Sequence, residues 1–184
     1  MSPAGFFSLV DRLSAGLTGG EILLCNLEGE DSDFVRLSGG RIRQAGSVRR
    51  SRLGLTLVSG SRQAEAGCDL SGDATGDFET GRAILSRLRE RILHVPEDPY
   101  LDYSTTPAES DSRAGSDLPE ARDAVADLAA VATGMDLVGI WASGDVRRGF
   151  ASSIGHRHWH QSGSFNLDWS CYLRRDKALK DSYG

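Results

Sequence analysis

Three of the chain's four histidines stand two residues apart in the stretch GHRHWHQ, residues 155–161. Side chains alternate between the two faces of an extended strand, so His156, His158 and His160 are predicted to share one face. Three imidazoles are also a ligand set of catalytic zinc sites. Histidines two apart on a strand lie about 6.5–7 Å apart along it, so they reach one ion only where the strand bends. The spacing leaves two interpretations open, the zinc site of an autonomous hydrolase and a polar strand face beside Trp159.

Other catalytic signals are weaker than the histidines. Ser143 lies in the string WASGD, which differs from the GxSxG elbow of the serine hydrolases. The sequence contains no HExxH motif, no phosphate-binding GxxxxGK[ST] loop and no GxGxxG fingerprint. Asp168 and Asp176 are candidate general acids without an identified partner. The three cysteines are far apart and form no CxxC pair, which argues against a zinc knuckle or a disulfide framework.

The composition indicates a globular chain. With 184 residues, of which 39% are hydrophobic and 26% charged, it fits a single domain. The net charge of −5 argues against a general affinity for nucleic acid or membrane surfaces. No apolar run approaches the length of a membrane span, and no basic leader precedes a small-residue cleavage site. We therefore expect a soluble, cytoplasmic protein.

The first part of the chain predicts one helix and a meander. Apolar residues at helical spacing extend from Phe6 to Leu17, and Gly19-Gly20 ends the run. Alternating segments then predict an antiparallel meander with Gly39-Gly40 as a hairpin turn. Its expected strands are residues 21–28, 32–37, 41–44, 46–58 and 62–70.

The rest of the chain repeats the order of helix and strands. A helix with an apolar stripe must end before Pro96, and residues 96–117 have the composition of a long surface loop. A further helix is expected from a cap at Asp117 to Gly134, followed by strands from residue 136 to 183. The predicted fold class is α+β, with antiparallel sheets, packed helices and two helix-then-sheet blocks. The expected divisions are a helix and meander (1–70), a helix and acidic loop (71–117), and a helix and second sheet (118–184).

Charge is distributed unevenly along the chain. Between Phe34 and Ala64 there are seven arginines and no acidic residue, whereas residues 97–127 contain nine acids and two arginines. The arginine-rich hairpin is one candidate for a nucleic-acid interface. Phe34 is its single aromatic residue, however, and no RNA- or DNA-binding motif occurs. We favour pairing with the acidic segment, within the chain or across a dimer. The seven are Arg36, Arg41, Arg43, Arg49, Arg50, Arg52 and Arg62.

The final quarter of the chain resembles the TldD/PmbA family, also called peptidase family U62 or "modulator of DNA gyrase". The strings DLVG, ASG, RGFA, SxG, WH and SFNxDWS occur in the family's order within residues 136–184. SDFVRLSGGRIRQAG (32–46) and YLDYSTTP (100–107) resemble the family's amino-terminal domain as well. Trp159 and His160 match the family pattern, whereas His156 and His158 stand where other polar residues are expected. The resemblance therefore reduces the weight of the zinc interpretation.

The resemblance implies a cytoplasmic protein that acts on peptides. In the TldD type, an HExxxH motif and a later cysteine hold the zinc of a metallopeptidase. The PmbA (TldE) type lacks these ligands and forms a heterodimer with the TldD type. The pair degrades unfolded or small peptides and processes peptide precursors. The metal motif lies downstream of the part that this chain resembles, so we expect an amino-terminal domain that has no cofactor of its own and lacks the catalytic carboxy-terminal domain.

The expected role is to help form the substrate cavity and a homo- or heterodimer contact, without catalytic residues. A peptide is expected to add as an extra strand at an exposed sheet edge. The candidate peptide contacts are Ser143, Arg148, Trp159, His160 and Asp168. No membrane partner is expected. A nucleic-acid module that uses the arginine hairpin and a zinc hydrolase that uses the three histidines remain as alternatives.

Overall fold

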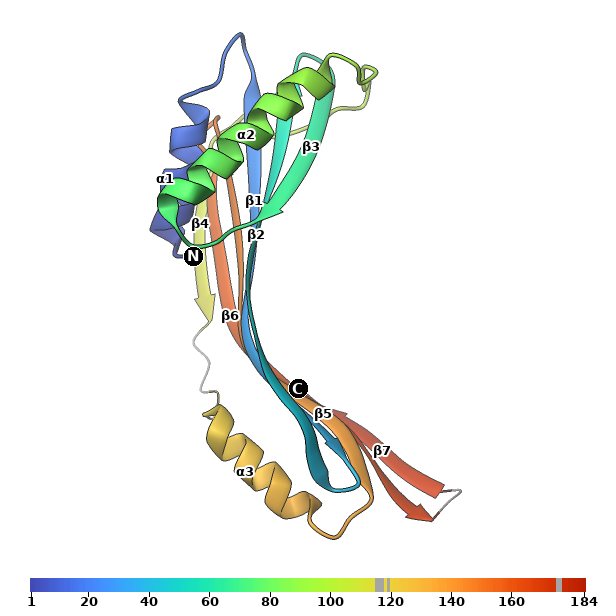
Figure 1. The fold of residues 1–184 in the computed structure, drawn as a ribbon. Coiled ribbons are helices and arrows are strands. Elements are labelled where there is room, and N and C mark those ends of the chain that lie inside the picture. Colours follow the sequence, from blue (N-terminus) through green and yellow to red (C-terminus); the bar gives the residue numbers. More distant parts are fainter. Residues whose placement is uncertain (115–117, 119, 175–176) are drawn as a thin grey trace. The chain divides into compact units, whose positions relative to one another are not determined.

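The computed structural model describes residues 1–114, 118, 120–174 and 177–184. Within them the chain forms three helices and seven strands (Figure 1). In chain order they are α1 (Pro3–Ser14), β1 (Ile22–Ser38), β2 (Arg41–Ser59), β3 (Arg62–Asp69), α2 (Ala74–Ile92), β4 (Glu109–Ala114), α3 (Ala121–Ala132), β5 (Leu137–Ser152), β6 (Arg157–Arg174) and β7 (Lys177–Tyr183). The predicted α+β class is confirmed.

The strands form one sheet in the order β3-β2-β1-β5-β6-β4, and β7 also pairs with β6. The predicted meander is present as β1, β2 and β3. Its first turn uses Gly39 and Gly40 at φ 59° and 66°, the left-handed conformation that a tight hairpin turn requires. The strands that the sequence assigned to a second sheet instead extend this same sheet, because β5 pairs with β1.

The chain divides into two compact units. Unit 1 comprises Met1–Gly29, Arg50–Arg113 and Arg147–Gln161, and unit 2 comprises Glu30–Arg49, Ala114–Val146 and Ser162–Gly184. Strands β1, β2, β5 and β6 each contribute one end to unit 1 and the other to unit 2. Each unit buries its own apolar cluster.

Helices α1 and α2 supply half of the core of unit 1. Ser2 caps α1 by accepting a hydrogen bond from the Gly5 amide at 3.2 Å, and Pro3 occupies the first turn, where a missing N–H costs nothing. The buried face of α1 then packs with α2 and the sheet in one cluster, which accounts for the predicted helical spacing. Its largest fully buried members are Trp159, Phe6, Leu13, Leu23, Leu27, Leu53, Leu55, Leu57 and Leu88.

The start of α2 is fixed by two carboxylates. Asp73 caps the helix by accepting from the Gly76 amide at 2.7 Å. Asp77, which is 3% exposed, accepts hydrogen bonds from the Ser71 amide and hydroxyl and from the Gly72 amide, at 2.8, 2.9 and 3.1 Å. A carboxylate with three donors can be buried without a large desolvation penalty. These bonds join the end of β3 to the helix.

Unit 2 has a smaller core. Val35 and Leu37 of β1, Ala124 of α3 and Trp141 of β5 form its buried cluster. Helix α3 begins at Ala121, with Glu120 in the cap position but no side-chain cap hydrogen bond. The predicted cap at Asp117 lies outside the described residues. No helix among the described residues is long and apolar enough to cross a membrane.

Several boundaries differ from the predictions. The segment expected to be a loop from 96 to 117 contains β4, which the sequence does not reveal because all six of its residues are exposed and show no apolar alternation. It is held by backbone pairing with β6. The strands predicted at 21–28 and 32–37 are one strand, β1, because the polar string EGEDSD between them remains extended. Helix α1 ends at Ser14, before the predicted Leu17.

A partly buried ion pair joins α2 to the connection before β1. It predicts a contribution to stability that is lost in acid. Both Glu21 carboxylate oxygens accept from the Arg89 guanidinium, at 2.8 and 2.7 Å, and the Arg89 hydrogen bond lowers the pKa of Glu21 below its ordinary value. Because the pKa of Glu21 is lower in the folded chain than in the unfolded chain, the ion pair stabilises the fold at pH values above the ordinary carboxyl pKa. This stabilisation is lost as the pH falls through the pKa of the folded state.

We therefore expect Glu21→Gln to lower the free energy of unfolding at pH 7 and to reduce its decline between pH 7 and pH 3. Urea denaturation at both pH values measures this. As a control, Glu79→Gln removes an exposed partner of Arg82 and should leave the pH dependence close to that of the parent chain. An unchanged acid decline in Glu21→Gln would contradict the assignment.

Candidate functional site

Strand β6 places its histidines and its tryptophan on opposite faces in unit 1. Trp159 is 2% exposed, and its ring centroid lies 6.5 Å from that of Phe6 in α1. His158 and His160, its neighbours along the strand, consequently point to the face away from α1. Trp159 was a predicted peptide contact, but its indole is part of the core. Its side chain therefore packs within the core, although the residue also contributes to the lining of the groove described below.

The three imidazoles do not form one cluster of ligands. His156 precedes β6, is 4% exposed, and its Nδ1 lies 2.7 Å from the Ser152 hydroxyl. Its ring centroid lies 6.2 Å from that of His158, and the two ring planes are inclined by 29°. Across the described residues, no group of three His, Cys, Asp or Glu side chains is placed to hold a metal ion. The histidines, cysteines and carboxylates that the structure describes therefore do not fit a catalytic zinc site.

A groove of about 410 Å³, lined by polar and apolar residues, lies on the open side of the unit 1 sheet, where His158 and His160 point. We call it the histidine groove. Ser110 of β4 fixes one edge, since its hydroxyl lies 2.8 Å from Nδ1 of His158. The remaining lining comes from β1, β4, β5 and β6 and comprises Asn26, Leu27, Glu28, Ser112, Arg148, Gly149, Phe150 and Trp159.

Three groups in the histidine groove are available to a ligand. Arg148, Glu28 and His160 are exposed, and none of them has an ion-pair or hydrogen-bond partner within the part of the chain that the structure describes. A guanidinium, a carboxylate and an imidazole can together contact both acceptors and donors of a polar chain. Glu28 and Ser110 were not among the predicted residues. Alternation could have identified Glu28, because it places Asn26 and Glu28 opposite the buried Leu27. Ser110 lies on β4, whose exposed residues give no such signal.

The other two predicted contacts lie in unit 2. Ser143 is 9% exposed and so is nearly closed to a ligand. Asp168 lines a second groove, of about 480 Å³, together with Arg36, Arg43 and Lys180. Of the five predicted residues, only Arg148 and His160 therefore offer free side chains to the histidine groove.

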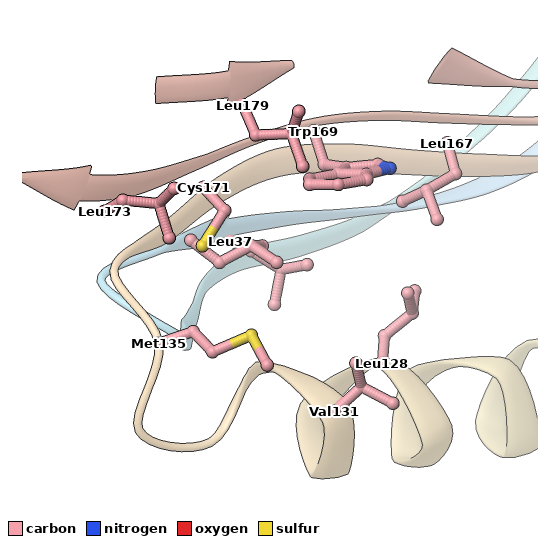
Figure 2. A pocket seen from close by; sticks show the side chains of 10 residues that line it. Leu37, Leu128, Val131, Met135, Leu167, Trp169, Cys171, Leu173 and Leu179 are labelled. Carbon is pink, nitrogen blue, oxygen red and sulfur yellow. The ribbon is translucent and has the colours of Figure 1, made fainter. Parts of the chain in front are cut away.

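Unit 2 also contains an apolar cavity of about 470 Å³, on the face of the sheet that α3 covers in part. Figure 2 shows Leu128 and Val131 of α3 and Met135 opposite Trp169, Cys171 and Leu179 of the strands. Several of these side chains remain accessible, including Val131 (65% exposed) and Leu173 (74%). The sequence predicted the apolar face of α3 but not the cavity beside it.

Four of the seven clustered arginines pair with carboxylates. Arg49 contacts Asp31 and Asp33, at 2.5 and 3.3 Å. Arg50 and Arg52 both face Asp69, at 3.1 and 3.8 Å, and Arg62 lies 3.6 Å from Glu97. Among the described residues, Glu97 is the one partner that belongs to the acidic segment that we expected to neutralise the arginines. The other partners are on β1 and β3, the strands on either side of β2.

Comparisons with known proteins identify similar folds. No family model matches the chain, and no curated protein matches it. Among solved structures, a protein described as a modulator of a DNA gyrase from Thermotoga maritima superimposes with a TM-score of 0.68 at 13% identity, over 97% of this chain and 42% of that one. TldE from Thermococcus kodakarensis gives a TM-score of 0.66 at 10% identity, over 97% and 42%. A modulator-of-gyrase protein from Bacteroides thetaiotaomicron gives 0.52 at 12%, over 97% and 43%.

These three structures are members of the TldD/PmbA family. The chain shares their fold over nearly its whole length and spans less than half of the length of each. The family resemblance read from the sequence is thus confirmed at the level of the fold.

Proposed function

We propose that this chain is the amino-terminal, non-catalytic domain of a TldD/PmbA-type peptidase and that it binds peptide substrate in the histidine groove. The observation that carries the proposal is the open groove itself, in which Arg148, Glu28 and His160 stand without partners among the described residues. The fold shared with TldE supports it. We expect the protein to act in the cytoplasm.

Strand β4 supports binding of an extended peptide. It pairs with β6 along one side and is an outer strand of the sheet, and all six of its residues are exposed. An outer strand offers backbone hydrogen-bond donors and acceptors to a further strand. It therefore recognises the main chain of a peptide more than its side chains. Ser110 and Ser112 of β4 also line the groove. A peptide added along β4 would therefore lie next to Ser110 and Ser112, at the edge of the groove whose further strands, β6 and β5, carry His160 and Arg148.

The proposal that this domain is non-catalytic rests on its metal-ligating and nucleophilic side chains. Hydrolysis of a peptide bond at neutral pH needs a metal-bound water or an activated nucleophile. The described histidines, cysteines and carboxylates form no three-ligand group. Cys25 is buried, and burial raises the pKa of its thiol to about 12, so it is not a thiolate nucleophile. In this proposal, zinc chemistry belongs to the remainder of a longer protein.

A dimer contact is part of the same proposal, and the apolar cavity of unit 2 supports it. Val131, Leu173 and Leu179 expose 65%, 74% and 58% of their surface beside that cavity. Accessible apolar groups of this kind are typical of protein interfaces. The partner would be a TldD- or PmbA-type subunit.

Peptide binding to the full chain tests the proposal. A fluorescein-labelled, unstructured, uncharged peptide of about ten residues should raise its anisotropy on titration, with a Kd between about 10 µM and 1 mM, as expected for a few hydrogen bonds and one strand. Arg148→Gln with His160→Ala should weaken binding by about tenfold, since each lost polar contact contributes about 0.5–1.5 kcal/mol. The matched control is Arg87→Gln, an exposed arginine of α2.

Three results would count against the proposal. The first is the absence of peptide binding up to millimolar concentration. The second is equal affinity in the groove variant and the parent chain. The third is cleavage of the peptide by the chain alone after addition of zinc, which would refute the non-catalytic assignment and restore the zinc hydrolase alternative.

A further inference from the structure

The second groove, which we call the basic groove, lies on one face of unit 2. Its cations come from three strands, with Arg36 on β1, Arg43 on β2 and Lys180 on β7. Val138 and Ile140 of β5 lie between them and are 42% and 36% exposed. The groove therefore combines a cationic rim with an apolar floor, in a chain whose net charge is −5.

The two arginines are neighbours with the same charge. The two-residue turn at Gly39-Gly40 places Arg36 opposite Arg43 on the paired strands β1 and β2. Like charges directly opposite each other destabilise a sheet unless an anion lies between them. Within the residues that the structure describes, Arg36, Arg43 and Lys180 have no ion pair, although the arginines further along β2 are paired.

The fourth charged group of the basic groove is a carboxylate. Lys180 pairs with Ser170 in the register of β6 and β7, and Asp168 lies two residues before Ser170, so all three share a face. Asp168 has no partner among the described residues either. It can accept from the backbone amide or the amino group of a ligand. A bound chain would thus meet three cations and one acceptor.

We propose that the basic groove binds acidic, extended peptide segments. The inference rests on the proposed function as a peptide-binding domain. It adds a second binding site, the basic groove, and specifies acidic peptides as its ligands. The apolar floor and the Asp168 carboxylate favour a peptide over a nucleic acid, whose phosphates Asp168 would repel.

The strand spacing predicts which acidic peptides bind. From β1 to β7 the order is β1, β5, β6, β7, three intervals of about 4.8 Å, or about 14 Å. In an extended peptide, residues i and i+4 are separated by about 13–14 Å. A peptide that crosses the strands can therefore place one acidic side chain at the arginine pair and the other, four residues later, at Lys180.

The experiment compares labelled eight-residue peptides on the full chain. One carries glutamates at i and i+4, one carries them at i and i+1, and one has glutamine at both positions. An oligothymidylate of eight nucleotides is the fourth probe. Variant Arg36→Gln/Arg43→Gln is compared with Arg82→Gln/Arg87→Gln, which removes the same charge from exposed positions of α2. Both substitutions of the first variant remove like-charge repulsion, so it is expected to fold.

We expect the i,i+4 glutamate peptide to bind at least tenfold more tightly than the glutamine peptide. The groove variant should lose most of that preference and the α2 variant should keep it. Binding should weaken between low and physiological salt, because exposed charges are screened. Equal affinity for glutamate and glutamine peptides, or an unaffected groove variant, would overturn the inference, as would tighter binding of the oligothymidylate, which would assign the groove to nucleic acid.

The binding experiments distinguish failure of this inference from failure of the proposed function. If the uncharged peptide binds and depends on Arg148 and His160, while glutamates add nothing, only the basic groove is refuted. If no peptide binds at either groove, both proposals fail.

Discussion

Replacement of Trp159 by alanine is expected to lower the free energy of unfolding by about 3–5 kcal/mol, the range for truncation of a buried aromatic side chain. Trp159 is 2% exposed and is the largest fully buried side chain of the chain's described residues. It packs against Phe6 and closes the core of unit 1 between β6 and α1. Because a domain of this size is stable by about 5–15 kcal/mol, the variant should be close to unfolding. Urea denaturation followed by circular dichroism measures the loss.

Trp159→Phe is the matched control. It keeps an aromatic ring next to Phe6 and removes the indole Nε1, which is buried and has no hydrogen-bond partner in the described structure. Removal of an unsatisfied buried donor offsets part of the lost volume, so the cost should be about 1–2 kcal/mol. An equal loss for alanine and phenylalanine would mean that the indole itself, and not the filled volume, holds the core.

A second large effect is expected for Gly144→Ala in unit 2. A methyl group at Gly144 would overlap the carbonyl oxygen of Asp31 and the Cα of Ser32, and would stand 2.7 Å from the Ser32 Cβ. The first two are backbone atoms of the neighbouring strand β1, so no side-chain rotation relieves the overlap. The strands would have to separate locally, which costs about 1–3 kcal/mol or more by the precedent of overpacked cores.

Gly54→Ala is the control for Gly144→Ala. It tests whether the loss of stability comes from the close approach of β5 to β1 and not from the replacement of any glycine within a strand. The nearest atom to a methyl group at Gly54 is the Asn26 Cβ at 3.8 Å, an ordinary contact. Alanine there reduces the freedom of the unfolded chain without strain, so we expect no loss of stability and a gain of up to about 1 kcal/mol. Thermal and urea denaturation of both variants should differ clearly. Similar losses would refute the role of the β1–β5 approach.

The elements that the sequence revealed are those with one buried face. Helix α2 was readable because Ile84, Leu85, Leu88 and Ile92 recur at helical spacing and are all buried. The glycine pair of the first hairpin was readable because only glycine adopts positive φ freely. Strand β4 has no buried residue and was missed. An outer strand held by backbone bonds leaves no pattern in its side chains.

The candidate site was predictable only in part. His160 and Arg148 do lie together in one groove, although 11 residues separate them in sequence, because β5 and β6 are adjacent. Alternation alone assigned Trp159 to the opposite face from its two histidine neighbours, so its burial could have been inferred. The grouping of Arg36 with Lys180 could not have been inferred from the sequence, because it depends on the order of the strands across the sheet. Local residue spacing does not encode that order.

The sharing of four strands between the two units has a consequence for folding order. Leu23 and Ser153 are joined by two hydrogen bonds, at 2.9 and 3.0 Å, across 130 positions of the chain. Closing so long a loop costs conformational entropy before any contact offsets it, and chains dominated by such distant pairings fold slowly. The hairpin of β1 and β2 in unit 2, in contrast, closes over a two-residue turn. Neither unit is a continuous stretch of the chain. During synthesis, unit 1 cannot finish folding until residue 161 has emerged, and unit 2 also needs residues 162–184. Until then, the nascent chain must keep its long amino-terminal strands from aggregating.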